Sequence, residues 1–230
     1  PKNYGSDKGN FSRDPLGKGG LEAPKIEKPT DTNKISTLEI KNIKQSFQKF
    51  NEFLSTHQVN LKEWDMFDLL KISKRFPYQF HHGHESICLI DNLGTKLRKE
   101  LFDIYGFLDF DKFKNFYDKG FSFIISDVLD ISDELKEIEK VALETFGVRI
   151  CGNFYFSKGL NNQNVSFPEH TDDYPLFIKN IYGESLWSIG NKEVVVKDQN
   201  VQFINRMTPH CVTSIKEPRL SLSLAIYKQD

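Results

Sequence analysis

Two histidines and an aspartate in the C-terminal half have the types and spacing to hold one metal ion. His170 and Asp172 form an H-x-D triplet that follows Pro168 and precedes a strand-like run. In an extended chain, residues two apart point the same way, so both side chains of the triplet can reach one ion. His210 lies forty residues downstream, soon after the strand-like run Val201–Ile204.

The triplet alone is weak evidence, because roughly 0.4 such triplets are expected by chance in a chain with this many histidines and aspartates. A single histidine is more often a surface or hydrogen-bonded core residue than a metal ligand. Two imidazoles and one carboxylate on one face of an ion leave the opposite positions open for a co-substrate and O₂, as in non-haem Fe(II) oxygenases. We therefore predict an iron site at His170, Asp172 and His210.

A cation and two hydroxyls begin the last strand-like run. Arg219, Ser221 and Ser223 alternate with three leucines, so the polar and apolar sets lie on opposite faces of the strand. The leucines need a buried layer, which leaves the polar face for a cavity. Because a guanidinium binds a carboxylate with two parallel hydrogen bonds, Arg219 with Ser221 could clamp a carboxylate. The alternative is a surface arginine at the start of a strand.

The first half of the chain is predicted to contain an arm and helices. Residues 1–34 are rich in Gly, Pro and Lys, which indicates a flexible or extended arm. Ser36 and Glu39 fit a helical capping box. Apolar residues then recur at spacings of three and four and predict one buried stripe: Ile40, Ile43, Phe47, Phe50 and Leu54. A second helix is expected over 64–72, and helical or turn-like structure over 96–119.

The character of the sequence changes at Gly120. Residues 121–125 predict a strand, and Asp133–Phe146 a helix that ends at Gly147. Short β-type runs separated by turns follow: 148–156, 176–181, 186–189, 193–196, 201–204 and 220–227. Closely spaced short strands are typical of a barrel or sandwich.

These elements predict an α+β protein in which N-terminal helices pack outside a β-rich core. We expect one domain over residues 35–230, with a helical lead-in at 35–119 and the β core at 120–230. The formal net charge of −1 speaks against a broad nucleic-acid-binding surface. No apolar run is long enough for a membrane helix. Three widely spaced cysteines without a CxxC pair indicate neither a disulfide framework nor a zinc ribbon, which favours a reducing cytoplasm.

The stretch from His170 to Trp187 resembles the JmjC and cupin-like 2-oxoglutarate oxygenases. After the H-x-D motif that family has a strand, a glycine thirteen residues past the histidine, here Gly183, and a Trp or similar residue soon after. The resemblance covers about residues 74–227. It implies a double-stranded β-helix, the jelly-roll fold of cupins. It also implies Fe(II), 2-oxoglutarate and O₂, with oxidation of a C–H bond.

The resemblance also bears on the carboxylate clamp. Many JmjC-like members place Lys or Arg two residues after that glycine, where this chain has Ser185. Either Arg219 takes over the clamp, or the co-substrate is not 2-oxoglutarate. The Arg219-x-Ser221 pair is similar to the R-x-S motif of isopenicillin-synthase-like oxygenases, which supports the first reading. Asn153, Tyr155 and Ser185 are expected to contribute to the cofactor pocket.

Our main hypothesis is therefore an Fe(II)/2-oxoglutarate-dependent dioxygenase that hydroxylates a small amino-acid-like molecule or a peptide. The presence of Asp172 favours hydroxylation, because the related halogenases replace this carboxylate with a small residue; desaturation and ring closure stay open as alternatives. The alternatives are a metal-dependent cupin isomerase or lyase that does not use 2-oxoglutarate, a protein hydroxylase, and a non-enzymatic binding module. Expected partners are the substrate and O₂, with neither nucleic acid nor a membrane.

Overall fold

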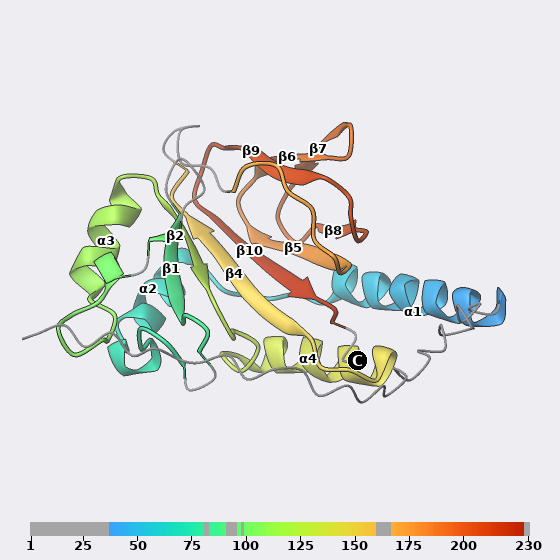
Figure 1. The fold of residues 1–230 in the computed structure, drawn as a ribbon, viewed down its shortest axis with the longest axis horizontal. Helices are drawn as coiled ribbons and strands as arrows, with labels where there is room; N and C mark the ends of the chain where they lie inside the picture. Colours follow the sequence, from blue (N-terminus) through green and yellow to red (C-terminus); the bar gives the residue numbers. More distant parts are fainter. Residues whose placement is uncertain (1–36, 81–82, 91–95, 98, 160–166, 228–230) are drawn as a thin grey trace, which may run out of the picture.

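A computed structural model describes most of the chain beyond the N-terminal arm. The described residues are 37–80, 83–90, 96–97, 99–159 and 167–227. The expected arm and Ser36 of the expected capping box lie outside them. Helices pack on one side of a β-rich core, as Figure 1 shows, so the predicted α+β arrangement is confirmed.

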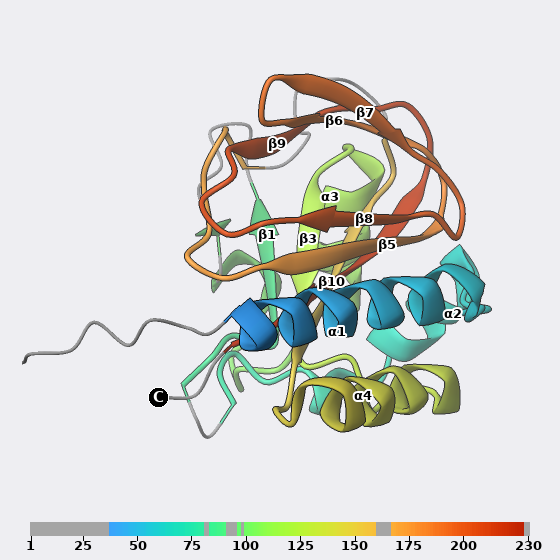
Figure 2. The same ribbon diagram turned by 90° about the vertical axis from the view of Figure 1, so that its right-hand side faces the viewer.

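The strands form two antiparallel sheets that face each other. The larger sheet has the order β2-β1-β3-β4-β10-β5-β8 and the smaller has the order β7-β6-β9. The first five strands are β1 (Ile87–Ile90), β2 (Lys96–Leu97), β3 (Ser122–Ile125), β4 (Cys151–Ser157) and β5 (Leu176–Tyr182). The others are β6 (Ser185–Ile189), β7 (Lys192–Val196), β8 (Val201–Ile204), β9 (His210–Ile215) and β10 (Arg219–Ala225). In Figure 2 the smaller sheet lies over β5 and β8, which closes the barrel.

The described residues form four helices, which pack on the large sheet. They are α1 (Thr37–Thr56), α2 (Glu63–Leu70), α3 (Phe110–Asp118) and α4 (Asp133–Phe146). Figure 2 shows α1 and α4 below β5 and β10, on the side away from the small sheet. The leucines of β10 are fully buried in the core that these helices cover: Leu220, Leu222 and Leu224. Burying each leucine side chain contributes about 2 kcal/mol, which fixes the face that β10 turns to the helices.

Helix α4 has the predicted bounds because both of its ends carry local signals. Ser132 caps the first turn by accepting a hydrogen bond from the backbone N–H of Leu135. Gly147 ends the helix in the left-handed conformation, with φ of 71°. The stripe predicted for α1 is only partly correct. Phe50 and Leu54 are buried, but Ile43 is 49% exposed, because the N-terminal turns of α1 project beyond the sheet (Figure 1).

Three of the observed strands were not predicted: β1, β2 and β9. Strand β1 lies inside the lead-in that was expected to be helical, at residues 35–119, and all four of its residues are buried. A strand buried on both faces has no alternating pattern, so periodicity does not reveal it. Strand β9 begins at His210 itself and pairs with β6. It follows Pro209 and mixes polar with apolar residues, so the sequence of this segment does not differ from that of a turn.

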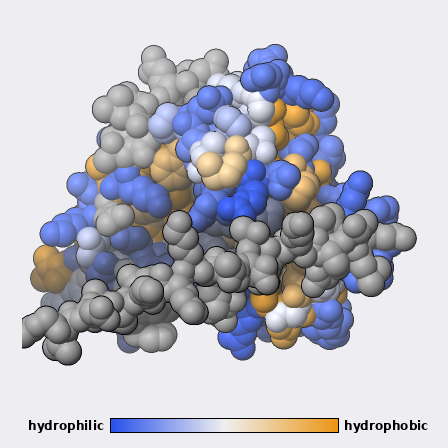
Figure 3. Space-filling model, turned by 45° about the vertical axis from the view of Figure 1, so that its right-hand side comes forward, coloured by the Kyte–Doolittle hydropathy of each residue, from blue (hydrophilic) through white to orange (hydrophobic). Residues whose placement is uncertain are grey.

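Three observations concern the helices, the cysteines and the surface of the molecule. None of the helices in the described ranges is long and apolar enough to cross a membrane. Cys88, Cys151 and Cys211 are all free. On the face shown in Figure 3, hydrophobic patches are small and interrupted by hydrophilic side chains.

Candidate metal centre

The structure brings His170, Asp172 and His210 together. One potential ligand atom from each residue lies within 4.8 Å of the others. Asp172 Oδ2 lies 3.4 Å from His210 Nε2. Across the described part of the chain, no other group of three or more His, Cys, Asp or Glu side chains meets in this way.

A short β-bridge between the two histidines builds the site. The His170 N–H donates to the His210 carbonyl at 3.2 Å, and the His210 N–H donates to the His170 carbonyl at 2.9 Å. Residues directly opposite each other in an antiparallel pair have neighbouring side chains on one face. The two imidazole centroids are accordingly 4.5 Å apart. The backbone therefore sets the spacing of the two histidines.

Hydrogen bonds also fix which ring nitrogen of each histidine faces the site. His170 Nδ1 lies 2.9 Å from the carbonyl oxygen of Pro168, and His210 Nδ1 lies 2.9 Å from that of Thr208. A carbonyl only accepts, so each Nδ1 must carry the hydrogen and donate it. Each Nε2 is then left with a free lone pair, which is the form of histidine that binds a metal.

Asp172 is held by the turn that precedes β9. Its carbonyl oxygen accepts a hydrogen bond from the Met207 N–H at 2.7 Å. Met207 has φ of 59°, a conformation that is uncommon for a residue with a side chain. This turn connects β8 to His210, so one backbone contact fixes Asp172 relative to the second histidine.

A cavity of about 440 Å³ opens over the three residues. Five aromatic side chains line it: Tyr155, Phe167, Tyr174, Trp187 and Tyr227. Asn153, Ser223 and Lys96 add a few polar groups. A mainly apolar cavity with few polar groups is the usual form of a small-molecule site. The predicted pocket residues Asn153 and Tyr155 therefore lie on its wall, whereas Ser185, Arg219 and Ser221 do not.

Ser185 has a different position from the one expected. It is buried, and its hydroxyl accepts a hydrogen bond from Trp187 Nε1 at 3.0 Å. The Trp187 ring in turn stacks on His210, with centroids 6.5 Å apart and planes at 24°. Ser185 therefore holds the indole of Trp187, which packs on His210, and does not itself line the cavity.

Ser221 does not have the free donor that a carboxylate clamp requires. Its hydroxyl donates to Asn180 Oδ1 at 2.6 Å. The Asn180 amide nitrogen donates to the carbonyls of Tyr182 and Gly183, which fixes the orientation of this amide. Because Oδ1 can only accept, Ser221 must donate to it, so its proton is already used.

Arg219 is a fully buried cation at the start of β10. It is 0% exposed, and its Nε and both Nη atoms have no hydrogen-bond partner among the described residues. Burial lowers the pKa of Arg219 to about 10, so it remains charged at neutral pH. An unpaired buried charge is unfavourable, and a bound carboxylate would satisfy it. The donor set and this unsatisfied guanidinium thus fit a metal together with an anionic co-substrate.

Tyr155 is close enough to both Asp172 and Arg219 for their charges to act on its pKa. Burial raises the pKa of Tyr155, the nearby charge of Asp172 raises it further, and the charge of Arg219 lowers it. Tyr155 is also the register partner of Ser221 on β10. Arg219 lies on the same face of β10 as Ser223, which lines the cavity. Arg219 is thus deeper in the barrel than the cavity wall, on the side of Tyr155.

The other buried cation faces away from the cavity. Lys179 Nζ donates to the carbonyl of Leu54 in α1 at 2.9 Å and to that of Gln199 at 3.3 Å. Its strand neighbours Leu176 and Ile178 line the cavity instead. Lys179 therefore joins the helical layer to the barrel and does not contribute to the site.

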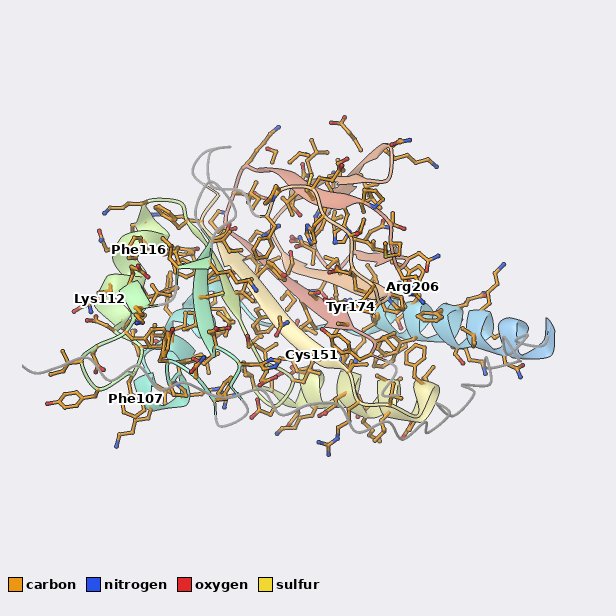
Figure 4. All side chains as sticks on the ribbon, viewed as in Figure 1. Phe107, Lys112, Phe116, Cys151, Tyr174 and Arg206 are labelled. Atoms are coloured by element: carbon orange, nitrogen blue, oxygen red, sulfur yellow. The ribbon has the colours of Figure 1, made fainter. Side chains whose placement is uncertain are left out.

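Sequence reasoning missed several cavity residues. Tyr174 is two residues after Asp172, so the alternation that paired His170 with Asp172 could have identified it. Tyr227 continues the alternating face of β10 in the same way. The ring centroids of Tyr174 and Tyr227 are 4.5 Å apart. Figure 4 labels Tyr174 beside the end of β10. Phe167 gave no sequence signal.

Comparisons with known proteins identify the fold and no family. No protein-family model and no curated protein matches the chain. Among solved structures, YcfD, a ribosomal oxygenase from Escherichia coli in complex with cobalt and succinic acid, has 13% sequence identity and a TM-score of 0.50. The match covers 78% of this chain and 51% of YcfD, so the chain spans about half the length of that protein.

A second solved structure matches a smaller part of the chain. It is a cupin 2 conserved barrel domain protein from Leptotrichia buccalis, at 14% identity and a TM-score of 0.30, covering 34% of this chain and 36% of that one. At these identities the comparisons concern the fold alone. The chain has a cupin-like double-stranded β-helix, as predicted, with a His-Asp-His group that could hold a metal ion.

Proposed function

We propose that the chain is an Fe(II)/2-oxoglutarate-dependent dioxygenase that hydroxylates a C–H bond. The observation that carries this proposal is the guanidinium of Arg219, which has no hydrogen-bond partner among the described residues and is buried in the same barrel as the His170, Asp172 and His210 group. A metal site alone fits many cupin reactions. A metal site with a buried, unpaired cation fits a co-substrate that carries a free carboxylate.

Each residue then has a definite role. His170, Asp172 and His210 would hold the iron, and Arg219 would receive the distal carboxylate of 2-oxoglutarate. Bound iron would supply the chemistry that activates O₂. Trp187, Tyr155 and the other aromatic residues of the cavity exclude water from that chemistry. Ser221 and Asn180 form a hydrogen-bonded pair that keeps the polar face of β10 in register beside Arg219.

The substrate is proposed to be a small amino-acid-like molecule or a peptide. The cavity reaches the surface beside the metal ligands, and His170 is itself exposed. A substrate can therefore approach the site from that side. The three free cysteines support a location in the reducing cytoplasm.

Replacing Arg219 tests this function. Arg219→Met should raise the 2-oxoglutarate concentration needed for half-maximal succinate release by at least about thirty-fold, because the carboxylate loses its buried partner. The same change should make the ligand-free protein more stable, by about 1–4 kcal/mol, because an unpaired buried charge is removed. Succinate release and urea unfolding measure the two effects.

Arg206→Met provides the matched control, because Arg206 is exposed and does not line the cavity. It should change neither quantity. If wild-type protein with Fe(II) and O₂ consumes no 2-oxoglutarate, with and without candidate amino acids and peptides, the 2-oxoglutarate assignment is wrong.

A second candidate is a metal-dependent cupin isomerase or lyase that does not use 2-oxoglutarate. It is favoured by the absence of Arg219 and Ser185 from the cavity wall and by the Ser221 hydroxyl, which already donates to Asn180. This alternative predicts tight metal binding without any effect of 2-oxoglutarate on thermal stability. The dioxygenase predicts a stabilising shift, and Arg219→Met should abolish that shift.

A further inference from the structure

A lysine on the wall of the cavity has no ion-pair partner among the described residues. Lys96, in β2, lines the cavity and lies over the ring of Phe167, with Nζ 5.4 Å from the ring centroid. It forms no ion pair with any residue that the structure describes. A cation on an aromatic face is held in place and remains available to an anion.

The other charges near the cavity are already assigned. Asp172 belongs to the metal group, and Arg219 lies deeper in the barrel, off the cavity wall. Glu169 and Asp173 adjoin the metal ligands in sequence, but neither lines the cavity. Lys96 is thus the one charged side chain of the described wall that is left for a substrate.

The surface between Lys96 and the metal group is aromatic. Phe167 contacts Lys96 on one side, and its centroid is 5.8 Å from the ring of His170 on the other. Tyr155 and Phe167 both pack against an apolar cluster on β1 and β3, formed by Cys88, Ile90 and Ile124. A molecule that reaches from Lys96 to the metal group therefore crosses an aromatic, mainly apolar surface.

We infer that the substrate is a small carboxylate with an apolar body, whose carboxylate binds Lys96 while its body packs on Phe167 and Tyr155. That this carboxylate is the molecule to be oxidised rests on the proposed function. That it binds here does not rest on it, because Lys96 and Phe167 lie outside both the metal group and the Arg219 site. This cavity chemistry narrows the substrate from amino-acid-like molecules in general to those with an apolar or aromatic side chain and a free carboxylate.

A pair of probes that differ only in charge tests this inference. Phenylacetate and phenylacetamide are titrated into the full chain, stripped of metal by a chelator and without 2-oxoglutarate, and their dissociation constants are measured by calorimetry. Wild type should prefer the carboxylate by about five-fold, as expected for one partly exposed ion pair. Lys96→Met should lose the preference, whereas Lys99→Met, an exposed lysine outside the cavity, should keep it.

A charge reversal gives a second readout that a folding defect cannot mimic. Lys96→Glu should prefer phenethylamine, whose ammonium replaces the carboxylate, over phenylacetate. An equal affinity of wild type for the acid and the amide would overturn the inference. So would a carboxylate preference that survives in Lys96→Met, since the anion would then bind elsewhere, for example at Arg219. Because the titration contains neither iron nor 2-oxoglutarate, its failure and the failure of succinate release can be told apart.

Discussion

At the scale of single residues, hydrogen bonds decide which side chains can act on a ligand and which are already occupied. Arg219 and Ser221 begin the same strand and form one sequence motif, yet they have opposite states. The Arg219 guanidinium has no partner among the described residues, and the Ser221 proton is given to Asn180. The sequence shows both residues on one face of β10. It does not show Asn180, which comes from a neighbouring strand of the folded sheet.

The proposed metal ligands are the first residues to test. His210→Ala should weaken Co(II) binding by at least about 100-fold, because only two of the three proposed protein ligands are left to bind the ion. Thr213→Ala, farther along β9 and exposed, is the matched control. Equilibrium dialysis followed by metal analysis measures both. Unchanged Co(II) affinity in His210→Ala would remove this residue from the site.

Ser185 tests whether the back of the site matters. Ser185→Ala removes the acceptor for Trp187 Nε1, so the indole should lose its fixed stacking on His210. We expect a several-fold loss of Co(II) affinity, below the roughly 10- to 100-fold typical of groups that hydrogen-bond directly to a metal ligand, and a change in tryptophan fluorescence. Ser188→Ala, on the same strand, should have neither effect. An unaltered affinity in Ser185→Ala would mean that Trp187 is positioned by packing alone.

At the scale of elements, the predictions succeeded where local signals were strong. Helix α4 has a cap, an apolar stripe and a terminal glycine, and its bounds were predicted correctly. Strand β8 was also predicted with the observed bounds. Strands β1 and β9 were missed, because burial on both faces or a mixed composition removes the alternation that marks a strand. Their positions depend on the partners β3 and β6, which a single sequence does not reveal.

The glycine that supported the family resemblance has a structural reason. Gly183 connects β5 to β6 with φ of +78°, and a Cβ there would overlap the carbonyl oxygen of Pro218. Gly106 has the same φ, but nothing lies within 4 Å of its Cβ position. Gly106→Ala should therefore cost about 1 kcal/mol from backbone strain alone. Gly183→Ala should cost clearly more, by roughly another 1–3 kcal/mol.

Urea unfolding of the two alanine variants separates backbone strain from overlap. Equal losses of unfolding free energy would show that the loop at Pro218 moves aside without cost. A larger loss at Gly183 is expected because Pro218 directly precedes Arg219, at the start of β10.

At the scale of the whole molecule, one buried lysine joins the helical layer to the barrel by hydrogen bonds. Lys179 is 0% exposed and donates to carbonyls in α1 and in the turn before β8. No described carboxylate pairs with it, so burial lowers its pKa to about 8 from the usual 10.5. A neutral amine still offers two N–H donors, so both hydrogen bonds survive deprotonation.

This shift predicts a pH dependence of stability. Between about pH 8 and 10.5 the unfolded state holds the proton and the folded state does not, so the unfolding free energy rises with pH. Over the whole interval the rise should be on the order of 3 kcal/mol, and it should stop above the unfolded pKa. The measurement is the difference in urea stability between wild type and Lys179→Met from pH 7 to 10, in which other titrating groups cancel. A difference that is flat across this range would mean that Lys179 is not desolvated in solution.

The β-bridge between His170 and His210 has a thermodynamic consequence for the whole domain. Two segments forty residues apart are closed into a loop by reciprocal backbone hydrogen bonds, so the entropy of closing that loop is lost on folding and not on metal uptake. Binding of an ion to this group would therefore include little cost of ordering the chain. A metal held there would exchange with the available pool of divalent metals. Which ion occupies it depends on supply as well as on the ligands.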